Sequence, residues 1–273
     1  MFKGLGVILV SAALAFVGCS GDKKAENKVA AKEDKSAKTI IVGATPVPHS
    51  EILEVVKPLL AKEGYTLEIK VFNDYVIPNK VTDSGEIDAN FFQHTPYLNE
   101  FNKSQGTKLV SVGNIHIEPI GVYSKKIKAL SELQEGDSVA IPNDPSNAGR
   151  ALDVLANAGL IKLKDADHKT KLDIVENPKN LKFTELEAAQ LPRVIEDFTI
   201  AVINTNYALP AGLNPSTDAL ALESANSPYA NILVVKAGNE NSDKTKALLK
   251  ALQSPEVKKF IIEKYKGAIV PAF

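Results

Sequence analysis

The chain contains almost no sulfur and no excess of either charge: its 273 residues include one cysteine, one methionine and no tryptophan. With a single cysteine, the folded part of the chain has no disulfide framework. Lys and Arg number 32 against 33 Asp and Glu, which leaves no basic field for nucleic acid. We therefore expect no nucleic-acid partner.

Catalytic motifs are also missing. The sequence has no GxSxG elbow and no GK[ST] phosphate loop, and its histidines, His49, His94, His116 and His168, lack the HExxH spacing of a metalloprotease. His116 with Glu118 is a possible metal pair, although an isolated HxE is a weak signal. The sequence thus predicts a protein that is not an enzyme, with no cofactor and no metal site.

The N-terminus has the pattern of a secretory signal. An apolar run at residues 5–17, too short for a comfortable membrane span, follows Lys3 and ends at Gly18-Cys19. A cysteine in this position resembles the lipobox of bacterial lipoproteins, although Phe16 stands where that motif usually has leucine. We predict that residues 1–19 are a lipoprotein signal peptide ending at a lipidated Cys19. The alternative is an ordinary signal peptide that happens to contain a cysteine.

The next segment predicts a tether. Residues 20–38 are rich in Lys, Glu and Ala and lack large apolar side chains apart from Val29, so they cannot bury enough surface to fold. A lipid anchor, a polar tether and a folded body describe a protein held at a membrane without crossing it. We expect a cell-membrane location, lipid-anchored and facing the periplasm or the extracellular side.

Residues 39–273 alternate short β-branched strands with amphipathic helices, which predicts an α/β fold with a parallel sheet in each of two blocks. Ligands of such sheets bind beyond the carboxyl ends of the strands. After the strand SVAI (138–141), Ser146 or Asn147 is expected to cap a helix, and Arg150 lies in its first turns. Free helix amides beside a guanidinium suit a carboxylate or a phosphate. The alternative for Arg150 is a solvated helix face.

Two further strand ends carry candidate residues. Asn204 follows FTIAVI (198–203) and offers a donor and an acceptor to a zwitterion, or it merely caps the next helix. The run FFQH (91–94) follows a short strand, and its adjacent phenylalanines cannot both face one core. One of them is therefore expected to line a cleft, while His94 either caps the next helix or binds a ligand.

Six segments together resemble the methionine-binding lipoproteins of bacterial ABC importers, the NlpA-type family, and they occur in order from about residue 39 to the C-terminus. The segments are DYVIPN (74–79), GEIDANFFQHTPYL (85–98), PNDPSNAGRAL (142–152), VENPKNLKFTELEAAQLPR (175–193), AVINTNYA (201–208) and SPYANILVV (227–235).

The resemblance implies a two-lobed, type II periplasmic-binding-protein-like fold with the ligand in the interlobe cleft. Residues 39–120 with 228–273 would form lobe 1, and residues 121–227 would form lobe 2. The resemblance also implies a ligand-binding set. In it, Arg150 takes the ligand carboxylate, Asn204 and Asn231 bind its amino and carboxylate groups, and the side chain is enclosed by Tyr75, Phe92 and His94.

The function implied by the resemblance is capture of L-methionine and its delivery to permease and ATPase subunits, by a protein expected to be a monomer. Two alternatives keep the fold: a methionine-containing dipeptide or D-methionine as ligand, and a metal-binding importer subunit using His94, His116 and Glu118. An enzyme or an adhesin on the same scaffold is a third alternative, since fold alone does not determine function.

Overall fold

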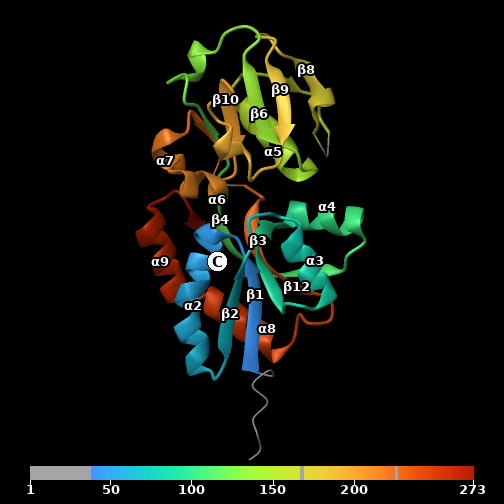
Figure 1. Ribbon diagram of the computed structural model, residues 1–273, viewed down its shortest axis with the longest axis vertical. Helices are drawn as coiled ribbons and strands as arrows, with labels where there is room; N and C mark the ends of the chain where they lie inside the picture. Colours follow the sequence, from blue (N-terminus) through green and yellow to red (C-terminus); the bar gives the residue numbers. More distant parts are fainter. Residues whose placement is uncertain (1–37, 167–168, 225–226) are drawn as a thin grey trace, which may run out of the picture. The chain divides into compact units, whose positions relative to one another are not determined.

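The computed structural model describes residues 38–166, 169–224 and 227–273, which belong to one structural unit (Figure 1). The predicted signal peptide, the lipidation site Cys19 and almost all of the predicted tether lie outside these residues, as does His168. Among the described residues, no helix is both long enough and apolar enough to cross a bilayer.

The first sheet has six strands in the order β13-β4-β12-β3-β1-β2. In chain order they are β1 (Thr39–Ala44), β2 (Thr66–Val71), β3 (Ala89–His94), β4 (Leu109–Ile117), β12 (Ala230–Lys236) and β13 (Val270–Pro271). Strand β1 pairs in parallel with β2 and β3, whereas β12 runs antiparallel between β3 and β4. The C-terminal part of the chain thus supplies a central strand of this sheet.

Helices cover both faces of the first sheet, with α2 and α9 on one side and α3 and α4 on the other (Figure 1). Their bounds are α2 (Glu51–Lys62), α3 (Ile77–Ser84), α4 (Thr95–Gln105), α8 (Asp243–Leu252) and α9 (Pro255–Tyr265), and a short helical turn, η1 (Pro46–Ser50), precedes α2. The main core of this part lies between the sheet and helices α2, α8 and α9. It includes Phe91, which is fully buried.

The second sheet has the order β11-β5-β10-β6-β9. Its strands are β5 (Gly121–Tyr123), β6 (Ser138–Pro142), β9 (Lys182–Leu186), β10 (Ile200–Ile203) and β11 (Ala221–Leu222). Along β10 the side chains alternate between two cores, since Ile200 and Val202 pack toward helix α5 (Pro145–Asn157) whereas Ala201 and Ile203 face the opposite side. Both faces of this strand are therefore covered.

Short elements complete this part of the chain. They are η2 (Leu130–Glu132), β7 (Lys162–Leu163), η3 (Lys171–Asp173), β8 (Ile174–Glu176), η4 (Leu191–Arg193), α6 (Thr205–Ala208), η5 (Leu209–Ala211) and α7 (Pro215–Asp218). Strands β7 and β8 pair only with each other.

The α/β class and the two sheets agree with the predicted two-lobed fold, but the expectation of purely parallel sheets was wrong. In the first sheet β12 and β13 are antiparallel to their neighbours, and in the second sheet β5 and β11 are. The reason is that β5 and β12 directly follow segments that pass from one sheet to the other, so no helix reverses the chain before them. The exact limits of the two lobes stay a prediction.

The run FFQH forms the last four residues of β3 rather than a turn after it. Because side chains alternate along a strand, Phe91 and Phe92 point to opposite faces. Phe91 joins the core, and Phe92 lies in a separate aromatic cluster with Tyr97 and Phe101.

Replacing Phe91 by alanine should lower the free energy of unfolding by about 3–5 kcal/mol, because it deletes a fully buried ring from the core. Urea denaturation followed by circular dichroism measures this change. Val71→Ala serves as the control, since Val71 ends β2 with half of its surface exposed and should change stability by less than about 0.5 kcal/mol. Equal losses in the two variants would contradict the assignment of Phe91 to the core.

Candidate ligand-binding site

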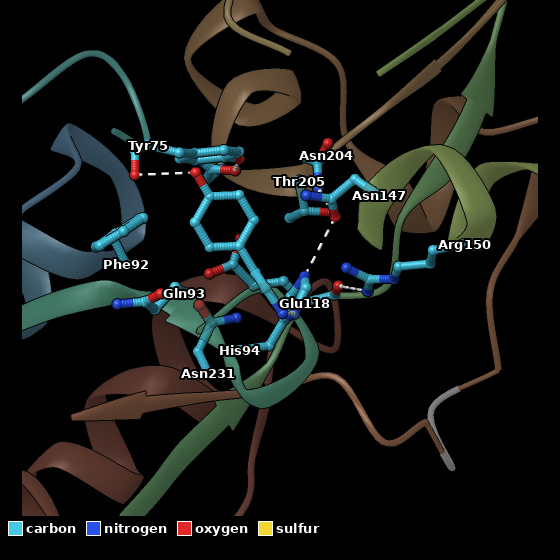
Figure 2. A pocket seen from close by; sticks show the side chains of 12 residues that line it. Tyr75, Phe92, Gln93, His94, Glu118, Asn147, Arg150, Asn204, Thr205 and Asn231 are labelled. Carbon is cyan, nitrogen blue, oxygen red and sulfur yellow. Dashed lines mark hydrogen bonds between the residues drawn. The ribbon is translucent and has the colours of Figure 1, made fainter. Parts of the chain in front are cut away.

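A cavity lies where the strand ends of both sheets meet (Figure 2). The lining residues are Tyr75, Phe92, Gln93, His94, Tyr97, Glu118, Asn147, Arg150, Asn204, Thr205, Asn206 and Asn231. All six residues predicted to bind a ligand are among them, so the structure brings the predicted set together around one space.

Arg150 provides the positive charge of the cavity. Its side chain is buried, so the alternative of a solvated helix face was wrong. The predicted cap of α5 was also wrong: Asp144 is the N-cap and accepts a hydrogen bond from the Asn147 amide at 2.9 Å. The cap precedes Pro145 because proline suits the first helical position, where no amide hydrogen is needed. Arg150 is thus two or three residues further into the helix than the expected cap would place it.

The guanidinium of Arg150 contacts the two segments that run between the sheets. It donates to the carbonyl of Glu118 at 2.7 Å, after β4, and to the carboxylate of Glu223, after β11, with Nε to Oε1 at 2.8 Å. The ring of Tyr229, just before β12, lies 4.5 Å from its Cζ. The charge is therefore paired and held in a fixed orientation.

Asn204 and Asn147 form the amide part of the site. Asn204 occupies the N-cap position of α6, but its side chain makes no capping bond and instead donates from Nδ2 to Asn147 Oδ1 at 2.9 Å. Its own Oδ1 is buried and has no hydrogen-bond partner among the residues that the structure describes. A buried carbonyl oxygen without a donor is costly, so this atom suits a ligand that brings one.

His94 both caps a helix and lines the cavity. Its Nδ1 accepts from the Tyr97 amide at the start of α4, and its Nε2 donates to Asn147 Oδ1 at 3.2 Å. Burial lowers the pKa of His94 to about 3, and the nearby Arg150 charge acts in the same direction. The imidazole is therefore neutral at physiological pH and adds no charge to the site.

One end of the cavity is aromatic. Tyr75 stacks on Phe92 with ring centroids 5.7 Å apart and meets Tyr97 edge-on at the same distance. The Tyr75 hydroxyl donates to Asn206 Oδ1 at 2.6 Å, joining the loop before α3 to helix α6. These rings provide an apolar surface for a side chain, at the other end of the cavity from Arg150 (Figure 2).

Glu118 supplies a buried carboxylate that the sequence marked only as half of a weak metal pair. Its Oε1 lies 2.6 Å from His116 Nε2 and 3.2 Å from His49 Nε2. Burial raises the pKa of Glu118, while His49 and Arg150 oppose that shift. Burial lowers the pKa of His49 to about 4 and that of His116 to about 3, so both rings are neutral. His116 donates from Nε2 to the Glu118 carboxylate, and the His49 ring lies beside it.

The same three side chains place one potential ligand atom each within 4.8 Å of one another. The set differs from the one considered in the sequence, since His49 takes part and His94 does not. The Glu118 carboxylate accepts a hydrogen bond from His116 and does not need an ion. If His116 Nε2 bound a metal, its Nδ1–H would normally donate to an acceptor, and the described residues place none there. The chemistry of the cluster therefore favours a hydrogen-bonded carboxylate.

Asn231 connects this cluster to the cavity. It lies in the second position of β12, which pairs with His94 on one side and His116 on the other. Its Oδ1 accepts a hydrogen bond from His49 Nε2 at 3.0 Å. His49 in turn accepts a hydrogen bond from the Thr45 hydroxyl at 2.7 Å through Nδ1.

Several lining residues were not singled out from the sequence as ligand contacts. They are Gln93, Tyr97, Glu118, Asn147, Thr205 and Asn206. Asn206 and Tyr97 stand within the runs INTN and HTPY, so proximity to Asn204 and His94 was an available signal. Nothing in the pattern indicated that Glu118 and His49, 69 positions apart, come together.

Comparison with known proteins gives a consistent result. A model of the NlpA lipoprotein family matches residues 40–273. The D-methionine-binding lipoprotein MetQ of Escherichia coli is 45% identical, with 98% of this chain and 96% of that protein covered. The methionine-binding lipoprotein MetQ of Bacillus subtilis is 42% identical over 98% and 97%. Among solved structures, a nutrient-binding protein from Burkholderia cenocepacia bound to methionine has a TM-score of 0.84 at 52% identity, covering 86% of this chain and all of that one.

The buried histidines make stability depend on pH. His116 stays neutral when folded down to about pH 3 but takes up a proton in the unfolded chain below about pH 6.5, so acid favours unfolding. Between pH 7.5 and 4.5 this single group should cost about 2–3 kcal/mol of stability. In chemical denaturation at both pH values, the free energy of unfolding of the wild type should fall by about 2–3 kcal/mol more than that of His116→Gln. Equal losses would contradict a neutral, buried His116.

Proposed function

Because the chain belongs to the NlpA lipoprotein family, we propose that it is the solute-binding lipoprotein of an ABC importer, which captures L-methionine and delivers it to the membrane permease and its ATPase. The observation that carries this proposal is one cavity lined by a buried guanidinium, a buried carboxyl group and aromatic rings, with Arg150 on the opposite side from Tyr75 and Phe92 (Figure 2). An amino acid with an apolar side chain has the same distribution of charge and apolar surface.

The charged head of a zwitterion can be matched group by group. Its carboxylate would meet Arg150, whose position is fixed by Glu118, Glu223 and Tyr229. Its ammonium group would meet the carboxylate of Glu118 and the unpartnered Oδ1 of Asn204. An ammonium beside Glu118 favours the ionised carboxylate and so offsets the effect of burial on its pKa. Both ligand charges are then compensated in a closed site, which burial requires.

The tail would lie against Tyr75, Phe92 and Tyr97. A thioether beside aromatic rings gains about 0.3–1.5 kcal/mol over plain burial, which is a modest preference. Selectivity for methionine over leucine therefore depends largely on the shape of the aromatic end. Capture and release involve no covalent step, and the lining residues act only through hydrogen bonds, charge and contact.

Arg150→Ala should weaken L-methionine binding by about 3–5 kcal/mol, because it leaves the ligand carboxylate and Glu223 buried without their cation. Isothermal titration calorimetry measures the change. Arg193→Ala is the matched control, since the chain's other arginine is exposed at the end of η4 and should leave the affinity unchanged. An unchanged affinity in Arg150→Ala would refute the assignment of the carboxylate site.

The same titration separates the alternatives for the ligand. A ligand present at a hundred times its Kd stabilises the protein by about 2.7 kcal/mol, so thermal shifts with L-methionine, D-methionine and methionyl dipeptides rank them directly. Zinc and manganese belong in the panel because of the His49, His116 and Glu118 cluster. A shift with a metal ion and none with any methionine derivative would overturn the proposed function in favour of a metal-binding subunit.

We also propose that Cys19 carries the lipid that holds the protein at the membrane, in line with the family to which the chain belongs. In cells expressing Cys19→Ala, the protein should move from the membrane fraction to the soluble exported fraction while its methionine affinity stays the same, because residue 19 precedes the folded body. Fractionation and immunoblotting measure the distribution. Retention of the variant in the membrane fraction would exclude a thioether-linked lipid as the anchor.

A further inference from the structure

Two buried polar atoms among the lining residues of the cavity have no hydrogen-bond partner in the described part of the chain. One is the acceptor Asn204 Oδ1, and the other is the donor Asn206 Nδ2. The two residues flank the first position of α6, and both are more than nine-tenths buried. Unpaired polar atoms in a closed space mark the places where a ligand has to supply the complementary group.

Two other amides of the lining, those of Gln93 and Asn147, are already committed at both ends. Gln93 donates to Asn79 and Asn90 and accepts from Asn79, so both ends of its amide are used. Asn147 accepts from His94 and Asn204 and donates to Asp144. The free donor of Asn206 is therefore not a general property of this polar surface.

Asn206 lies at the aromatic end of the cavity. Its Oδ1 accepts the hydroxyl hydrogen of Tyr75 at 2.6 Å, and the Tyr75 ring stacks on Phe92. This bond occupies the oxygen of the amide and leaves Nδ2 as its unpartnered group. Arg150, which is proposed to match the ligand carboxylate, lies on the opposite side of the cavity from Tyr75 and Phe92 (Figure 2), so an amide bonded to Tyr75 is on the side where the ligand's side chain would lie.

We propose that Asn206 is a specificity-determining residue whose Nδ2–H donates a hydrogen bond to the sulfur of a thioether amino acid. This inference rests on the proposed function. A thioether sulfur is a weak acceptor, but it is the only acceptor in the tail of methionine. A tail of the same shape without sulfur leaves the Asn206 donor buried and unpaired, so the residue discriminates against it.

Norleucine is the appropriate probe, because it replaces the sulfur by a methylene group and keeps the head and the chain length. Calorimetric titrations of the wild type with L-methionine and L-norleucine give the Kd for norleucine divided by the Kd for methionine, a ratio that should exceed one. In Asn206→Ala that ratio should fall by about threefold to tenfold toward one, since only methionine loses a hydrogen bond. Asn206→Leu, which fills the volume that alanine leaves to water, should show the same fall.

The matched control is Asn204→Ala, which removes the other unpartnered amide. Both ligands carry the same ammonium group, so both affinities should weaken by the same factor and the ratio should stay at the wild-type value. A ratio that is unchanged in Asn206→Ala and Asn206→Leu, in a wild type that binds methionine, overturns the role of Asn206 and leaves the proposed function intact. A fall of the ratio in Asn204→Ala equal to that in Asn206→Ala also overturns it. Failure of the wild type to bind either ligand overturns both.

Discussion

A buried positive charge has to be compensated inside the protein, and Arg150 is the charge around which this structure is arranged. Its guanidinium is held by the carbonyl of Glu118, the carboxylate of Glu223 and the ring of Tyr229. These three residues belong to the segments that connect the two sheets. The group proposed to bind the ligand carboxylate is therefore in direct contact with both connections. A movement of that carboxylate would act on the two connections directly through Arg150.

The second charge of the site is compensated in a different way. Glu118 accepts a hydrogen bond from the neutral ring of His116 and lies beside the neutral ring of His49, and no lysine or arginine side chain among the described residues forms an ion pair with its carboxylate. A neutral donor keeps the carboxylate oriented without cancelling its charge. The carboxylate thus keeps its attraction for an ammonium group, which a salt bridge to lysine or arginine would have reduced. The two ends of a zwitterion meet one paired cation and one anion held by hydrogen bonds.

Much of this arrangement could be predicted from the sequence, because it follows from local rules. The alternation of strands and helices predicts the α/β class, and the search at strand ends pointed to Arg150, Asn204 and Phe92, which all line the cavity, although Phe92 lies within β3. The antiparallel β12 and β5 were missed because periodicity within a segment carries no information on strand direction. Glu118 was missed as a ligand contact because its environment depends on His49. That residue lies in η1 after β1, and β12 and β3 separate β1 from the strand that precedes Glu118. Tyr75 and Asn231 came from family resemblance, since neither stands out by residue type or spacing.

The position of β12 has a consequence for how the protein is made. This strand lies between β3 and β4 in the first sheet, and two of the three helices that cover one face of that sheet, α8 and α9, follow it. Until a growing polypeptide extends beyond residue 236, β3 and β4 have no common neighbour and the core around Phe91 is open on one side. The second sheet, whose strands all lie between residues 121 and 222, has no such requirement. Synthesis from the N-terminus therefore completes the strands of the second sheet first, and the first sheet receives its last strands afterwards.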